Sequence, residues 1–449
     1  MIHLIDKTAR RRLLGGVMLL TWAAGAPAEE SGYVRLLPND GNNVYAATGL
    51  LRQWPDGGPK EVWRARIGEG KSAVIEAGGR AFTAMQEEGQ QYALGLDAAT
   101  GKILWKTLIA TNGNHHNVAG PVSSPVVDGD RVYFIPYKNN NGDMYDIRCP
   151  VFCLRAKDGG TNWSEGEKFV STEGSTPLIA GNTLYISGST SNAILAAVNK
   201  MTGDLLWKTA EPNDTQQKRA VYGAGASLTY EVMEGVPQII ISIYRNDNMG
   251  VNANTGEILW HWQFPTPASS GMVSTPVAIG SRVFFSGFQG NASFGICLDV
   301  EKKDGKFEPV IRTQSTRLQC NAFHTVSIVN GAVYGFGLDT NGEAPQEALQ
   351  CTDFESGGLL WEQTGPDWSR RNNMTVADGL IFALTRKDEL VMAEANKTGY
   401  KELGRVNPGV KLGVQGIQQQ PTIFNGRLYL RGNDTVVCYQ VGAARGGAQ

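Results

Sequence analysis

Short apolar runs separated by two-residue turns recur along the chain, without helical periodicity over any comparable length. Six stretches share an apolar run, a pair such as Asp-Gly, Ala-Gly, Asn-Gly or Ile-Gly, and a second apolar run: SSPVVDGDRVYFI, STPLIAGNTLYIS, STPVAIGSRVFFS, VSIVNGAVYGF, VADGLIFALT and PTIFNGRLYLR. This order is typical of a tight antiparallel hairpin. The pattern therefore predicts a fold that is almost entirely β.

A second repeated motif accompanies these hairpins, and in it a Trp stands four residues after a turn glycine. The copies are GLDAATGKILW, CLRAKDGGTNW, AVNKMTGDLLW, GVNANTGEILW and CTDFESGGLLW. Two degraded copies place Pro309 and Leu403 in the Trp position. An eighth copy begins at Cys438 and ends before any Trp, whereas Trp63 lies in a predicted strand that has no turn of its own before it.

The spacing of these motifs indicates one repeat architecture rather than two or three separate domains. The Trp positions follow one another at intervals of roughly 40 to 60 residues, and a unit of about that length with four short strands is one blade of a propeller. We predict an all-β, eight-bladed β-propeller with four antiparallel strands per blade. The N-terminal strand that carries Trp63 is expected to join the C-terminal blade and close the ring, because this pairing removes two free strand edges.

Two columns of the repeat are interpreted as packing positions. The position ten residues before the Trp holds only small residues: Gly95, Cys153, Ala197, Gly250, Cys297, Cys351, Ala393 and Cys438. A strand position restricted in this way faces a close neighbour. The Trp residues are expected to be structural, each stacked against the next blade: Trp63, Trp105, Trp163, Trp207, Trp260 and Trp361. Cys149 and Cys320 lie outside the column, and a Cys149–Cys153 disulfide is an alternative to free thiols.

The N-terminus has the order of a secretory signal peptide. Basic residues from Lys7 to Arg12 precede an apolar segment, and Ala26-Pro27-Ala28 precedes Glu29. We predict a signal peptide at residues 1–28, an N-terminal lead-in at 29–49, the propeller at 50–441 and a disordered tail at 442–449. The arginine run is compatible with ordinary secretion of an unfolded chain or with twin-arginine export of a folded one. The mature protein is expected in the periplasm or outside the cell.

The net charge of the chain limits the classes of partner that it can bind. The formal net charge is −2, and cleavage of the basic leader makes it more negative. Such a balance argues against nucleic acid as the main partner. After the leader, no apolar run approaches the length of a membrane span. We expect an exported monomer without a transmembrane segment.

With these motifs the chain resembles the PQQ-binding-like β-propeller repeat proteins of the quinoprotein alcohol dehydrogenase-like superfamily, over essentially all of residues 50–441. It is similar to BamB-like propellers but lacks a lipobox cysteine. The resemblance implies an exported eight-bladed propeller. The quinoprotein dehydrogenases resemble one another in an adjacent Cys-Cys pair, a Trp under the quinone, a Glu and an Asn that ligate Ca²⁺, and an Asp base. This sequence has no Cys-Cys dipeptide and no Cys-x-x-Cys-His haem motif.

Basic and amide side chains gather in the segments that connect the outer strand of one predicted blade to the inner strand of the next. These segments meet at one mouth of the ring, where Lys71, Asn372 and the run from Gln418 to Gln420 are also expected, and only Asp214 and Asp367 supply a carboxylate nearby. The candidate ligand-binding residues are His115, His116, Arg219, Arg317, His324, Arg371 and Gln419.

A basic mouth on an acidic protein can attract an anion, although the same side chains also solvate loops. His115 and His116 are adjacent and point to opposite sides of an extended segment, so they cannot both ligate one metal. We predict no metal and no cofactor. Our leading hypothesis is a non-catalytic binding or scaffold propeller for a protein partner, an anionic polymer or a small anion. The alternative is a PQQ- and Ca²⁺-dependent oxidoreductase acting on alcohols or sugars.

Overall fold

The computed structural model describes residues 33–111, 120–136, 150–165, 175–190, 192–211, 227–243, 247–263, 272–289, 292–315, 325–339, 346–369, 372–414 and 417–443. All regular structure in these ranges is β-strand. None of the described residues forms an apolar helix of membrane-spanning length. The predicted signal peptide lies outside the described residues, as does the predicted tail apart from residues 442 and 443.

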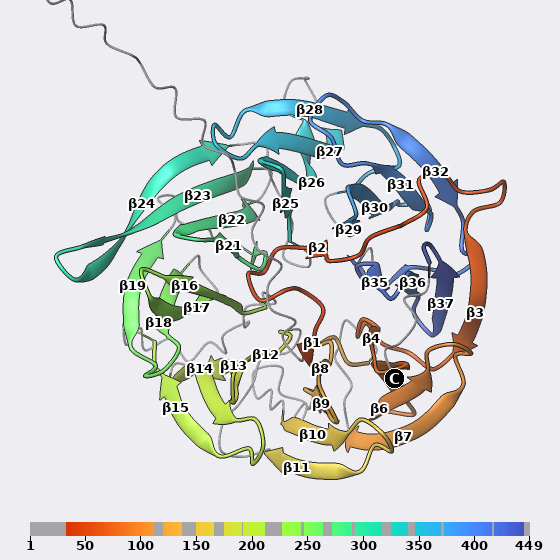
Figure 1. Ribbon diagram of the computed structural model, residues 1–449, viewed down its shortest axis with the longest axis horizontal. Coiled ribbons are helices and arrows are strands. Elements are labelled where there is room, and N and C mark those ends of the chain that lie inside the picture. The colour runs from red at the N-terminus through yellow and green to blue at the C-terminus, as the bar shows by residue number, and fades with distance from the viewer. Residues whose placement is uncertain are drawn as a thin grey trace, which may run out of the picture. The chain divides into compact units, whose positions relative to one another are not determined.

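Eight four-stranded antiparallel sheets surround a common centre, which confirms the predicted eight-bladed propeller (Figure 1). From the centre outward, the first four blades are β4 (Ile75–Ala77), β5 (Arg80–Glu87), β6 (Gln90–Asp97) and β7 (Ile103–Ala110); β8 (Val126–Asp128), β9 (Arg131–Phe134), β10 (Val151–Arg155) and β11 (Thr161–Glu165); β12 (Leu178–Ala180), β13 (Thr183–Thr190), β14 (Ala193–Asn199) and β15 (Leu205–Thr209); and β16 (Thr229–Met233), β17 (Val236–Ile243), β18 (Asp247–Asn252) and β19 (Ile258–Gln263).

The remaining blades follow the same order. They are β20 (Met272–Val273) with β21 (Val277–Ile279), β22 (Arg282–Gln289), β23 (Ala292–Lys303) and β24 (Lys306–Ser315); β25 (Ser327–Val329), β26 (Ala332–Asp339), β27 (Gln346–Asp353) and β28 (Leu359–Thr364); β29 (Met374–Ala377), β30 (Leu380–Leu384), β31 (Leu390–Glu394) and β32 (Glu402–Val406); and β35 (Thr422–Phe424), β36 (Arg427–Arg431), β37 (Thr435–Gln440) and β3 (Lys60–Arg66). β1 (Tyr33–Val34) and β2 (Val44–Tyr45) add to the inner strands of blades 2 and 7, and β33 (Gly413–Val414) pairs with β34 (Ile417–Gln418).

The inner hairpins turn through the two-residue pairs that the sequence pattern contains. Asn425 and Gly426, between β35 and β36, have φ angles of 51° and 74°. Positive φ at both central residues is the conformation of a type I′ turn, whose twist matches that of the flanking strands. This local geometry explains why Asn-Gly and Asp-Gly recur at the same point of the repeat.

The small column and the Trp column face each other across the two outer strands of a blade. Gly95 on β6 pairs with Trp105 on β7, and Gly250 on β18 pairs with Trp260 on β19. A Cβ added to Gly95 would lie 2.2 Å from the Trp105 ring, and one added to Gly250 would lie 2.0 Å from Trp260. The indole of the same blade is therefore the close neighbour that keeps this position small.

Several of these indoles also contact the following blade. Trp63 Nε1 donates to the carbonyl oxygen of Ala98 at 2.9 Å, and Trp105 Nε1 donates to that of Ala156 at 3.1 Å. A Cβ on the turn glycine of the next blade, Gly101 or Gly159, would come within 2.6 Å of the same ring. The ring thus packs on one blade and hydrogen-bonds the next, so it fixes the junction between them.

The two degraded copies were aligned wrongly from sequence. In blade 5 the residue opposite Cys297 is Thr313, whereas Pro309 pairs with Val300, because β23 and β24 extend the hairpin beyond the usual turn. In blade 7, Met392 and Gly404 take the paired position that Gly95 and Trp105 have in blade 1, so Ala393 and Leu403 were each placed one residue off. Trp54, from the segment between β2 and β3, lies against Gly404 and stands where the repeat lacks its own Trp.

The ring is closed by the N-terminal strand, as the orphan Trp63 predicted. β3 pairs antiparallel with β37 from Lys60↔Gln440 to Arg66↔Thr435 and so forms the outer strand of blade 8. Trp63 packs with Tyr429 and Cys438 of that blade and with Leu94 and Leu96 of blade 1 in one buried cluster. Closure therefore joins the two ends of the described chain through both a strand ladder and a hydrophobic core.

Candidate functional site

The centre of the ring contains a segment that the repeat does not predict. Residues 33–45, here called the central strap, cross between the inner strands and include β1 and β2 (Figure 1). Tyr33 and Val34 pair with β8 of blade 2, and the carbonyl oxygens of Asn39 and Asp40 accept hydrogen bonds from blades 4 and 5 at 2.7 and 2.8 Å. Val44 then pairs with β29 of blade 7. The strap thus links blades that are far apart around the ring.

Asn43 is the best-connected residue of the central strap. It is fully buried, and its Nδ2 donates to the carbonyl oxygen of Met374 at 2.6 Å. Its Oδ1 accepts from Thr375 Oγ1 at 2.8 Å and from Gln420 Nε2 at 3.1 Å, and its carbonyl oxygen accepts from Ser327 Oγ at 2.7 Å. One side chain and its backbone therefore bind three neighbouring blades. A buried amide needs such partners, since an unpaired one costs free energy.

Gly41 lets the strap pass close to blade 5. Its φ is 73°, and an added Cβ would lie 2.1 Å from the carbonyl oxygen of Pro276. No other residue fits this approach without moving the backbone.

Buried hydroxyl groups surround the strap just before the inner strands begin. They include Ser72, Ser123, Ser124, Ser175, Thr176, Ser227, Thr275 and Thr325. Their hydrogen bonds run from blade to blade: Ala73 N to Ser124 Oγ at 3.1 Å, Ser123 Oγ to Ser175 O at 2.8 Å, Thr176 N to Ser227 Oγ at 3.2 Å, Ser227 N to Thr275 Oγ1 at 2.9 Å and Thr325 Oγ1 to Thr275 O at 2.7 Å. This hydroxyl belt stabilises the inner wall of blades 1 to 6.

Two cations are buried near the axis. Arg35 of the strap is 5% exposed, and its Nη2 donates to the carbonyl oxygen of Leu228 at 3.2 Å. Burial lowers the pKa of Arg35 to about 10, against the opposing fields of Tyr33 and Asp40. Lys71, which precedes β4, is 4% exposed, and burial lowers its pKa to about 8. Both groups remain largely charged at neutral pH, so the inner wall carries positive charge away from bulk water.

Most of the residues predicted to bind a ligand at the mouth lie outside the described residues. These are His115, His116, Arg219, Arg317, His324 and Arg371. Gln419 is described and half-buried. Its neighbour Gln420 donates to Asn43 and to the hydroxyl of Tyr45, so the amide run serves at least in part to hold the strap. Asn372 is buried and accepts from the backbone of Ser369 within its own turn.

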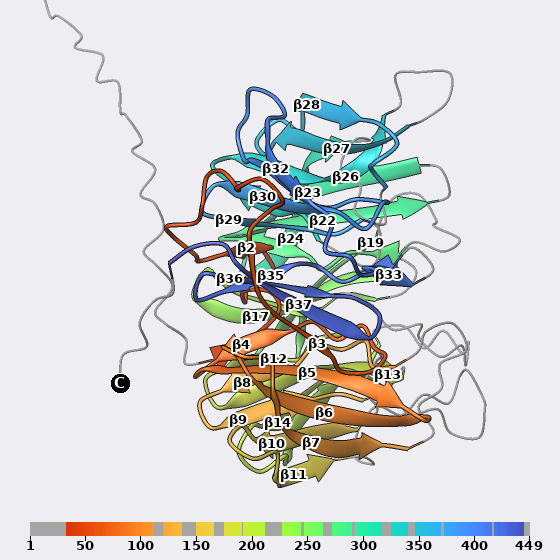
Figure 2. The same ribbon diagram turned by 90° about the vertical axis from the view of Figure 1, so that its right-hand side faces the viewer.

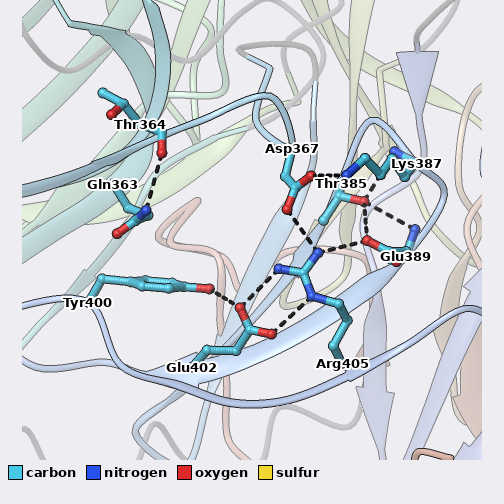
Figure 3. Close-up of polar contacts among 9 residues, drawn as sticks. All are labelled: Gln363, Thr364, Asp367, Thr385, Lys387, Glu389, Tyr400, Glu402 and Arg405. Carbon is cyan, nitrogen blue, oxygen red and sulfur yellow. Dashed lines mark hydrogen bonds and ion pairs between the residues drawn. The ribbon is translucent and has the colours of Figure 1, made fainter.

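Asp367, one of the two carboxylates expected near the mouth, belongs to an ion-pair network (Figure 3). Its carboxylate lies 3.0 Å from Arg405 Nη1 and 2.8 Å from Lys387 Nζ. The same guanidinium contacts Glu389 at 2.7 Å and Glu402 at 3.0 Å. Hydrogen bonds from Lys387 and Arg405 hold the pKa of Asp367 below its usual value. Asp367 is therefore a charged structural partner, and this removes it as a candidate proton acceptor at neutral pH.

The described cysteines are free, buried and far from nucleophilic. They are Cys153, Cys297, Cys351 and Cys438, each in a different blade. Burial raises the pKa of Cys297, Cys351 and Cys438 to about 12. Within the described ranges, no three His, Cys, Asp or Glu side chains are grouped as metal ligands. Cys149 and Cys320 lie outside the described residues.

Sequence reasoning missed the central strap and the hydroxyl belt. The strap is not part of the repeat, so it leaves no periodic signal. The belt does have one, because SSPVV, STPLI and STPVA each place two hydroxyl residues before a Pro at the start of an inner strand. A stretch of small polar residues that recurs in register is a sign of a shared buried environment.

Similar solved structures share the propeller fold at low sequence identity. BamB from Moraxella catarrhalis is 14% identical, with a TM-score of 0.56, over 85% of this chain and 97% of that one. A europium-containing methanol dehydrogenase is 14% identical, with a TM-score of 0.63, over 89% of each chain. The computationally designed Ika8 protein is 10% identical, with a TM-score of 0.54, over 85% of this chain and all of that one. At such identities the likeness concerns the fold alone.

The family comparison is more specific than the structural likeness. No curated protein matches the chain by sequence. The family model described as outer membrane protein assembly factor BamB matches residues 44–165 and 145–341, which together exceed half of the chain. The chain therefore belongs to the family of the outer membrane protein assembly factor BamB.

Proposed function

We propose that this protein is a non-catalytic, exported propeller that binds a protein partner during the assembly of outer membrane proteins. The observation that carries the proposal is the use of the ring centre. Asn43 binds the strap to blades 6, 7 and 8 through Ser327, Thr375 and Gln420. The axis is thus built as a rigid support, which suits a scaffold that presents an extended surface.

The rim of the ring offers a surface for such a partner. The outer strands β7 and β15 expose Leu104, Leu108 and Leu206, with 45%, 46% and 53% of each side chain accessible. Exposed leucines on the outer strands of a sheet are a liability unless a partner covers them. The predicted basic mouth, represented by Arg317 and Arg371, is a second surface that we propose for an acidic segment of the same partner.

The described inner wall does not suit the dehydrogenase alternative. Ca²⁺ prefers several carboxylate and carbonyl oxygens, whereas the described strap offers a single carboxylate, Asp40, beside buried hydroxyl groups, Lys71 and the Arg35 guanidinium. The four described thiols lie in four different blades, and the sequence has no Cys-Cys pair to stack on a quinone. We therefore propose that neither PQQ nor Ca²⁺ is a resident cofactor.

Two measurements test the proposal together: the amount of folded outer membrane proteins, and photo-crosslinking of a partner to the rim. Depletion of the protein from its cell envelope is expected to lower the amount of folded outer membrane β-barrel proteins. Photo-crosslinkers placed at Leu104 and Leu206 are expected to capture a component of that assembly machinery, whereas one at Lys302, on the exposed tip of blade 5, is the matched control. Unchanged barrel levels together with no capture at the rim would refute the scaffold function.

The same purified protein decides the enzymatic alternative. Incubation with PQQ and Ca²⁺ is expected to leave no bound quinone absorbance and no dye reduction with alcohols or aldose sugars. Stoichiometric quinone binding with turnover would show that the protein is an oxidoreductase and not a scaffold.

The predicted basic mouth is tested by the double variant Arg317→Ala, Arg371→Ala. This variant is expected to bind an acidic partner peptide more weakly, and unaltered binding would remove the mouth from the proposal.

A further inference from the structure

Arg35 is a buried cation whose hydrogen-bonding capacity is only partly used. Its Nη2 donates to the carbonyl oxygen of Leu228, but Nε and Nη1 have no acceptor among the described residues. Burying a charged group without partners is costly, because the guanidinium loses its hydration. An unsatisfied group of this kind in a native structure points to a water molecule or ligand that completes it.

Two unpaired hydroxyl groups belong to the same part of the inner wall. Leu228 follows Ser227, whose Oγ accepts from Thr176 N at 3.2 Å. Thr176 Oγ1 and Ser175 Oγ are buried and also have no partner among the described residues. The hydrogen bonds from Arg35 Nη2 and from Thr176 N thus end on two consecutive residues of blade 4, Leu228 and Ser227.

The nearest acidic residue of the strap does not satisfy Arg35. Asp40 raises the pKa of Arg35 through its field, yet it forms no ion pair with Arg35 among the described contacts. The Asp40 carboxylate instead accepts from its own strap, at Asn42 N, at 2.9 Å. A guanidinium with unused N–H donors is the chemistry that recognises an anion.

We propose that Arg35, Ser175 and Thr176 bind a small oxyanion of the carboxylate or phosphate class at the centre of the ring. The Nε–H and Nη1–H groups donate to the oxygens of the anion, and the two hydroxyls donate beside them. This site goes beyond the scaffold function and lies on the strap and the inner wall, apart from the exposed rim. The bound anion adds hydrogen-bond acceptors for the guanidinium that Asp40 does not supply.

Thermal unfolding in the presence of inorganic phosphate or succinate tests the site. At constant ionic strength, the midpoint of the wild type is expected to rise and saturate with one of the two anions, as binding to the folded state requires. The rise should be absent in Arg35→Gln. Arg66→Gln is the matched control, because Arg66 is an exposed arginine on β3 that pairs with Asp434. The anion that produces the rise identifies whether a phosphate or a carboxylate occupies the site.

Two further measurements keep the result decisive. The double variant Ser175→Ala, Thr176→Val is expected to lower the affinity for the anion about tenfold, since a hydrogen bond to a charged group contributes about that factor. If Arg35→Gln fails to fold, a bromide-soaked crystal of the wild type should show an anomalous peak beside the guanidinium. Equal stabilisation of wild type and Arg35→Gln, or water alone at Arg35 in that crystal, would overturn the site. Capture of a partner at the rim does not depend on Arg35, so either proposal can fail alone.

Discussion

The N-terminal part of the described chain closes the propeller twice, and the two closures are built differently. β3 completes blade 8 through a backbone ladder with β37 and a Trp that packs as in other blades. The central strap instead uses side-chain amides, one close glycine contact and single backbone hydrogen bonds to several inner strands. Figure 2 shows β3 running beside β37 where the first closure is made. The first closure repeats a pattern and tolerates local change, whereas the second depends on individual residues.

Removal of both closures is expected to have the largest effect. A variant that lacks residues 31–66 loses the outer strand of blade 8, so both β37 and the junction with blade 1 are exposed. We expect it to lose cooperative thermal unfolding and near-UV circular dichroism. A variant that lacks only residues 31–45 keeps β3 and should retain a cooperative transition at a lower midpoint. Equal melting of the two variants would mean that the strap, and not β3, closes the ring.

A single strap residue should matter nearly as much as a blade Trp. Asn43→Ala removes the side-chain donor to the carbonyl oxygen of Met374 and the acceptor of Thr375 Oγ1, while Gln420 keeps the hydroxyl of Tyr45 as an acceptor. The expected loss is about 2–4 kcal/mol in the free energy of unfolding, since each buried unsatisfied group costs about 1–3 kcal/mol. Trp63→Ala should cost about 3–5 kcal/mol.

Denaturant unfolding of Asn43→Ala and Trp63→Ala measures the free energy that each closure contributes, and Gln419→Ala is the nearby control. A loss below about 0.5 kcal/mol for Asn43→Ala, the range of ordinary surface substitutions, would show that the strap only rests on the inner wall.

The smallest effect concerns pH. Burial raises the pKa of Asp40 to about 6, above its ordinary value. The contribution of the protonated form to stability is therefore fully present below the unfolded pKa near 4 and is lost as the pH rises through about 6. Asp40→Asn keeps an acceptor for Asn42 N and cannot ionise. Its melting midpoint should exceed that of the wild type at pH 8 and converge with it at pH 4, and a constant difference across this range would contradict the shift.

The propeller was predictable because its blades repeat. Hairpin turns, the small column and the Trp column each recur in register, and Trp63 without a turn of its own identified the closing strand. Pro309 and Leu403 were aligned wrongly because the outer hairpins of blades 5 and 7 are longer than that of blade 1, which changes the spacing without changing the apolar pattern. The strap could not be found in this way, since Gly41 and Asn43 owe their roles to Pro276, Ser327 and Gln420, which are all more than 200 residues away.

The predicted ligand-binding mouth stays a prediction, because six of its seven residues lie outside the described ranges. Basic groups near the axis were expected, and Lys71 is one of the residues foreseen. Arg35 was not, because a lone arginine in a lead-in segment has no pattern to distinguish it. Asp367 was placed near the mouth, but its partners Lys387 and Arg405 are separated from it in sequence and only the fold shows that they neutralise it.

The register of β3 against β37 also sets the order in which the protein can reach its native state. Lys60 must wait for Gln440, so β3 remains without its partner strand until the last blade exists. Native contacts so distant along the chain make folding slow, and an unpaired edge is open to wrong partners in the meantime. Moving β3 to the C-terminus by circular permutation, behind residue 443, would make every blade contiguous and is expected to speed refolding while leaving the finished ring unchanged.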